Sequence, residues 1–175
     1  PNQTVTLSSN PYDWFEASFF YTNVQDRPYC YDFSTPFCNQ DFKDKGFNVK
    51  VRVKEEGKLP AIAIGLNDFA GTGIYSSEYI VGSYGINKTD FHFGLGFGLL
   101  DGSDLSFKNP LGYISDKFNE RPGQLQDKGG SFQPSRYFSG ETVSPFFGVS
   151  HVLRDKLILK LEHDSSVRPG LVPFR

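Results

Sequence analysis

Long hydrophobic runs, methionine and long helix-forming stretches are all missing from this 175-residue sequence. No apolar run approaches the roughly 18 residues that a membrane-spanning helix needs, so we expect no transmembrane helix in this sequence. The 18 glycines and 11 prolines interrupt the chain too often for long helices. Apolar residues make up 38%, which is low for a compact globular domain. The formal net charge of -2 argues against a nucleic-acid partner held through its phosphates.

The lack of methionine bears on whether the chain has been processed, and the two cysteines bear on the redox state of its cellular compartment. The chain has no methionine and begins at Pro1, so we expect a processed product or a segment of a longer protein. Cys30 and Cys38 lie in a polar stretch rich in Tyr, Pro and Asp. Their spacing permits a loop disulfide and an oxidising compartment; two unpaired thiols are the alternative. The histidines are scattered and no second cysteine pair is present, so we expect neither a metal nor another cofactor.

Aromatic residues are what the sequence has in abundance, at 16% of the chain. Many aromatic and few aliphatic residues favour an all-β protein. In segment 91–100 large apolar residues alternate with glycine, and successive side chains of a strand point to opposite faces. One face therefore carries an apolar row that we expect to face lipid. The other face carries a histidine and three glycines, which allow either a close approach of backbone or a crowded or wet interior. The row consists of Phe91, Phe93, Leu95 and Phe97.

A strand of about ten residues with one apolar face suits a tilted crossing of a bilayer. The alternative is a strand of a soluble β-sandwich, whose apolar face packs on a second sheet. Short and long connections alternate between the predicted strands, which is typical of an up-and-down barrel. Segment 101–140 is long, polar and rich in Gly, Pro and Ser, and we expect no regular structure there. The other predicted strands are 14–23, 47–54, 61–66, 78–85, 143–150 and 156–163.

The predicted fold class is therefore all-β, an antiparallel transmembrane β-barrel or the first part of one, with long polar loops and one domain over residues 1–175. An open set of strands leaves edges that lipid does not tolerate, which is why we expect the chain to be part of a longer protein.

Charged residues on segment 47–54 alternate with valines, so if the valines meet lipid the charges point into a lumen. We expect a lumen charge network in which acidic residues at the ends of neighbouring strands pair with these basic groups. A catalytic carboxylate pair formed by Asp68 and Glu78, as in glycoside hydrolysis, is the alternative. The network consists of Lys50, Arg52, Lys54, Asp68 and Glu78.

Three stretches resemble the N-terminal part of the YjbH/GfcD proteins, which are bacterial outer-membrane lipoproteins associated with exopolysaccharide or capsule production. They are residues 11–17, 43–50 and 59–79, and the last contains the specific run Gly71-Thr72-Gly73-x-x-Ser76-Ser77-Glu78-Tyr79. The resemblance implies an outer-membrane β-barrel that assists export or surface assembly of an exopolysaccharide. Family members are several hundred residues long. The lipid-bearing cysteine of such a lipoprotein is its terminal residue, and neither Cys30 nor Cys38 is terminal in this chain.

If the protein is such a barrel, we expect that it is not an enzyme and that it lies in the bacterial outer membrane. Its expected partners are outer-membrane lipid, the polysaccharide and other export proteins. Nucleic acid is not among the expected partners. A soluble carbohydrate-binding β-domain and a glycan-processing enzyme that uses Asp68 and Glu78 are the two alternatives. Detergent dependence separates the first from the barrel, and activity on a purified polysaccharide separates the second.

Overall fold

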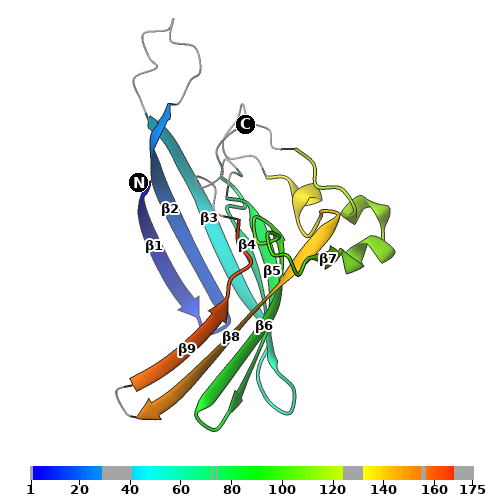
Figure 1. The fold of residues 1–175 in the computed structure, drawn as a ribbon. Coiled ribbons are helices and arrows are strands. Elements are labelled where there is room, and N and C mark those ends of the chain that lie inside the picture. The colour runs from blue at the N-terminus through cyan, green and yellow to red at the C-terminus, as the bar shows by residue number, and fades with distance from the viewer. Residues whose placement is uncertain are drawn as a thin grey trace, which may run out of the picture.

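The computed structural model describes residues 2–28, 41–71, 73, 75–123, 132–154 and 157–167. Nine antiparallel strands form one strongly curved sheet (Figure 1), ordered β1-β2-β3-β4-β5-β6-β8-β7, with β9 also paired to β8. The predicted disulfide between Cys30 and Cys38 lies outside the described residues. The strands are β1 (Asn2–Tyr12), β2 (Phe15–Pro28), β3 (Asp41–Lys54), β4 (Ala61–Asn67), β5 (Ser77–Ile86), β6 (Thr89–Gly98), β7 (Phe107–Lys108), β8 (Thr142–Arg154) and β9 (Leu157–His163).

Short and long connections lie at opposite ends of the sheet. At one end, drawn at the bottom of Figure 1, connections of at most six residues join β1 to β2, β3 to β4, β5 to β6 and β8 to β9. At the other end the connections are longer and include residues 68–76 and 99–141. The last of these contains β7 and three short 3-10 helices, η1 (Pro110–Tyr113), η2 (Asp116–Phe118) and η3 (Pro134–Arg136).

The predicted all-β antiparallel fold is confirmed, but the described strands do not close into a barrel. In the described part of the chain, β1 pairs with β2 alone and β9 with β8 alone, so each presents an open edge. Two elements depart from the sequence prediction. Strand β1 was not expected, because its apolar residues are few, and segment 99–141 is not irregular throughout, because side-chain hydrogen bonds organise it.

Apolar side chains lie mostly outside this sheet rather than in a core. Among the described residues three apolar side chains are buried, whereas eleven polar or charged ones are. Residues in register share a face, and the exposed apolar residues follow the convex face from one edge of the sheet to the other. Examples are Val5 (71% exposed), Leu7 (73%), Phe93 (59%) and Leu161 (71%). A soluble domain rarely exposes so extended an apolar surface.

No helix in the described ranges combines the length and the apolar character that a bilayer crossing by a helix requires.

Candidate functional site

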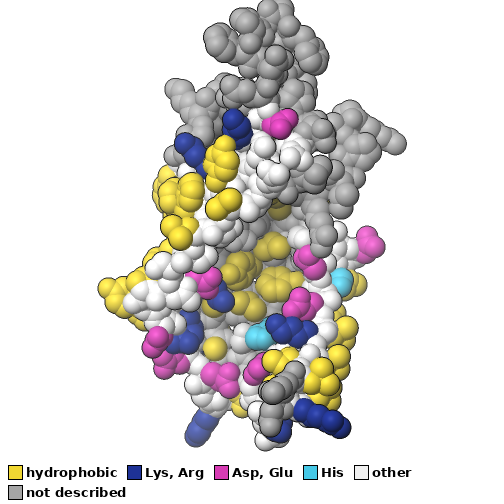
Figure 2. All heavy atoms as spheres, turned by 90° about the vertical axis from the view of Figure 1, so that its left-hand side faces the viewer, with side chains coloured by type: hydrophobic (Ala, Val, Ile, Leu, Met, Phe, Trp, Pro, Cys, Tyr) yellow, Lys and Arg dark blue, Asp and Glu magenta, His cyan; other side chains and the backbone are white. Residues whose placement is uncertain are grey.

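A polar and aromatic trough runs along the concave face of the sheet. Figure 2 looks onto this hollowed side, where hydrophobic side chains form the floor and charged side chains and histidine surround it. Its central part is a cavity of about 500 Å³ that draws side chains from six strands, β3, β4, β5, β6, β8 and β9. Those that define its character are Lys50, Tyr79, Ser83, His92, Phe146 and Glu162.

Two aromatic rings form the floor of this trough because glycines on the neighbouring strands leave room for them. The Tyr79 ring leans onto β4 at Gly65, where an added Cβ would lie 2.1 Å from the ring. The Phe146 ring leans onto β6 at Gly94, where an added Cβ would lie 2.2 Å away. The two rings meet across β6 with centroids 6.1 Å apart and an interplanar angle of 83°. The glycine face predicted for segment 91–100 is therefore the crowded floor of the concave side.

The trough continues toward the short-turn end as a second cavity of about 590 Å³. Its lining is more polar and includes Glu16, Lys50 and Arg52, with Trp14 at its edge. The Trp14 indole stacks on Tyr12 at 5.5 Å and 7°. Lys50 lines both cavities and so connects them.

Two basic residues of the predicted lumen network, Arg52 and Lys54, have partners other than Asp68 and Glu78. Lys50 and Arg52 line the concave cavities, and Arg52 forms an exposed ion pair with Glu55 at 3.4 Å. Lys54 lies after a register shift in β3 and donates to the carbonyl oxygens of Glu55, Leu59 and Pro60 at 2.9–3.3 Å. These hydrogen bonds of Lys54 therefore stabilise the connection between β3 and β4.

Glu78 pairs with Arg121, a residue that the sequence did not single out. The carboxylate is fully buried, and the Arg121 guanidinium donates to both of its oxygens, at 2.7 and 2.8 Å. Arg121 also donates to the Ser76 hydroxyl at 2.8 Å, and the Phe138 amide donates to Glu78 at 3.0 Å. This bidentate, charge-assisted cluster fastens segment 99–141 to the long-loop end of β5. Glu78 and Arg121 are 43 residues apart in sequence, so no local spacing pattern predicts their pairing.

Asp68 occupies a different buried site, in the connection after β4. It is 2% exposed, and its Oδ2 accepts the Tyr75 amide at 3.0 Å. Burial, and secondarily the charge of Asp44, raises the pKa of Asp68 from 3.8 to about 7. Nearby Arg136 opposes this shift by its positive charge. Asp68 and Glu78 are thus both buried and held by different partners, a geometry that offers no support for a catalytic carboxylate pair.

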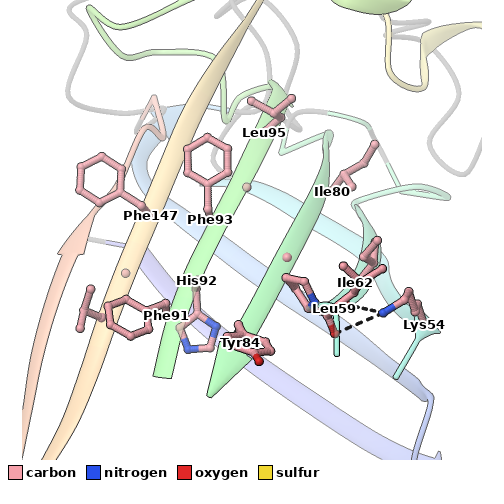
Figure 3. A pocket seen from close by; sticks show the side chains of 15 residues that line it. Lys54, Leu59, Ile62, Ile80, Tyr84, Phe91, His92, Phe93, Leu95 and Phe147 are labelled. Atoms are coloured by element: carbon pink, nitrogen blue, oxygen red, sulfur yellow. Dashed lines mark hydrogen bonds between the residues drawn. The ribbon is translucent and has the colours of Figure 1, made fainter. Parts of the chain in front are cut away.

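The predicted apolar row of β6 divides into an exposed and a covered part. Phe91 (43% exposed) and Phe93 (59%) lie open on the convex face, and Leu95 lies partly exposed beside them. Together with Ile80 and Phe147 they line a shallow apolar groove of about 810 Å³ (Figure 3).

Phe97 is the exception, since it is 1% exposed and packs edge-on against Phe138 at 5.2 Å. It cannot face lipid in this structure, because segment 99–141 covers it. The sequence prediction missed this because nothing in β6 itself shows where a later segment folds back over the strand.

Among the described residues no group of three or more potential ligand side chains is placed to hold a metal ion. The fold and site define a class of protein: a curved antiparallel sheet with an apolar convex face and a polar, aromatic concave face. The family model described as "YjbH: Exopolysaccharide biosynthesis protein YbjH" matches residues 1–167, so the chain belongs to the YjbH family. This confirms the resemblance seen in the sequence.

One relative is the "Uncharacterized lipoprotein YjbH" of Escherichia coli (strain K12), which is 37% identical over 157 residues. The match covers 89% of this chain and 22% of that protein, so the chain spans about a fifth of the relative's length. No solved structure matches the chain.

Proposed function

We propose that this chain contributes strands to an outer-membrane β-barrel that assists export or surface assembly of an exopolysaccharide. The observation that carries the proposal is the exposed apolar surface of the convex face, set against a polar trough on the concave face. Lipid-facing and lumen-facing residues alternate in this way along the strands of a membrane barrel. The family description adds the link to exopolysaccharide.

The two ends of the sheet support the same proposal. Four connections of at most six residues lie at one end, as the periplasmic turns of outer-membrane barrels do, and segments 68–76 and 99–141 lie at the other, as their surface loops do. Segment 99–141 covers the convex face at Phe97, so the lipid-facing band is expected to begin below that residue, at Leu95 and Phe93. In this arrangement the lumen guides the polysaccharide, and polar groups of the trough contact its hydroxyls.

Cysteine accessibility in native membranes tests the proposal. Phe93→Cys on the convex face should resist a water-soluble maleimide, whereas His92→Cys, the adjacent residue on the concave face, should react through the aqueous lumen. Val5→Cys and Thr6→Cys provide a second such pair on β1, and the unsubstituted protein measures labelling of Cys30 and Cys38. Equal reactivity of convex and concave positions, or recovery of the protein in the soluble fraction without detergent, would favour the soluble carbohydrate-binding domain instead.

A further inference from the structure

We propose that Tyr79 and Phe146 form a stacking platform for uncharged pyranose units of a polysaccharide chain. The inference rests on the proposed function and deepens it, because it names the chemistry of the substrate and the residues that contact it. Its starting point is the pair of partly exposed rings on the floor of the concave trough.

The rings are held in place rather than free to turn. Each leans onto a glycine of a neighbouring strand, Tyr79 onto Gly65 and Phe146 onto Gly94, and each glycine is itself buried. A side chain at either glycine would displace the ring above it. Rings fixed in this way present apolar surface to the trough with little conformational entropy left to lose on binding.

The chemistry of the surrounding groups suits a sugar. The apolar C–H face of a pyranose packs on an aromatic ring, because the negative ring face attracts weakly positive hydrogens. Around the rings lie hydrogen-bonding groups for ring hydroxyls, among them Ser83 and His92, which are joined at 2.9 Å, with Lys50 and Glu162 close by. A ligand that is apolar on its faces and polar at its edges matches this lining.

The charge of the trough selects against a polyanion. Six residues that are charged at neutral pH, histidine aside, line the two concave cavities, and four of them are acidic. They are Asp13, Glu16, Glu162 and Asp164 against Lys50 and Arg52. A polyuronate or phosphate-rich chain would meet net negative charge there, so we infer an uncharged polysaccharide.

The test measures oligosaccharide binding by the intact protein in micelles of a detergent without a sugar head group. The probes are uncharged gluco-, manno- and galacto-hexaoses, with a polyuronate hexamer as the anionic comparison. At least one uncharged probe should bind, and Tyr79→Ala and Phe146→Ala should each weaken that binding by about tenfold or more. Tyr79→Phe keeps the ring and should bind within about twofold of the original protein.

Ile80→Ala is the matched control, since Ile80 lines the apolar groove of the convex face (Figure 3), whereas its neighbour Tyr79 lines the concave cavity. It should leave binding unchanged, and circular dichroism checks that every variant is folded. If a ring variant fails to fold, Gly94→Ala, which displaces the Phe146 ring, takes its place. Binding of no uncharged probe, preference for the polyuronate, or unaltered binding by folded ring variants would overturn the platform. Cysteine accessibility tests the membrane barrel separately, so failure of one proposal is distinguishable from failure of the other.

Discussion

At the residue scale, Asp68 makes the stability of this protein depend on pH. Its pKa of about 7 in the folded chain exceeds the ordinary 3.8, so the folded state holds the proton more tightly than the unfolded state. The stabilisation from this proton is complete below pH 3.8 and is lost as pH rises through about 7, at a rate of at most about 1.4 kcal/mol per pH unit.

Asp68→Asn removes this dependence while keeping an oxygen to accept the Tyr75 amide. The variant should gain in stability relative to the original protein as pH rises, with a larger difference at about pH 8 than at about pH 5. Thermal unfolding at the two pH values measures this. A difference that stays constant with pH would show that Asp68 titrates normally.

A second residue-scale prediction concerns the two faces of β6. Phe93→Arg places a charge on the exposed apolar face near mid-strand and should cost about 2–4 kcal/mol of stability in a bilayer. His92→Arg, one residue earlier, points its charge into the trough and should cost less than about 1 kcal/mol. Urea unfolding in lipid vesicles compares them. Equal effects of the two substitutions would contradict the assignment of faces.

At the scale of elements, the Glu78–Arg121 pair holds segment 99–141 on the sheet. Glu78→Gln leaves the Arg121 charge buried without its carboxylate and should destabilise the protein by about 3–5 kcal/mol. Adding Arg121→Met to this variant should restore part of the loss, because the uncompensated charge is then gone. Limited proteolysis within 99–141 and thermal unfolding together measure the effect.

The exposed pair of Arg52 and Glu55 is the control for that experiment. Its side chains are 36% and 83% exposed, so Arg52→Gln should change stability by less than about 1 kcal/mol. If Glu78→Gln proves as mild as Arg52→Gln, the pair does not fasten the segment.

The same elements show how far the sequence predicts the structure. Period-two alternation locates β4, β5, β6, β8 and β9 to within a few residues, because alternation depends only on local pattern. It finds β2 and β3 but not their full length, since β2 extends to Pro28 and β3 begins at Asp41. For the glycine face of β6 it left a close backbone approach, a crowded interior and a wet interior open, and the rings of Tyr79 and Phe146 decide for the crowded one. The partner of Glu78 and the burial of Phe97 were beyond reach, because both depend on a connection of more than forty residues folding back over β5 and β6. Strand β1 shows only a weak alternation of apolar and polar residues, which consists of Val5 and Leu7. The surrounding serines and threonines make this pattern hard to recognise.

At the scale of the whole molecule, the trough and the apolar convex surface are two consequences of one curved sheet. Curvature brings the concave side chains of six strands together around Tyr79 and Phe146, and it spreads the convex side chains apart. A flat sheet of the same sequence would have the same two faces but no cavity between strands. The small residues Gly65 and Gly94 allow this curvature to coexist with two large rings on the inside.

The open edges of the sheet lead to the last prediction. Unpaired backbone amides and carbonyls on β1 and β9 would each cost several kcal/mol in the hydrocarbon layer, so a membrane location requires that other strands pair with them. In the intact protein in bilayers, the β1 amides that point away from β2 should therefore exchange with solvent deuterium as slowly as those of β4, which is paired on both sides. Hydrogen exchange with mass spectrometry measures this, and β4 and β5 serve as internal references. Rapid exchange along β1, with β4 and β5 protected, would show that the sheet remains open there and would count against a closed barrel.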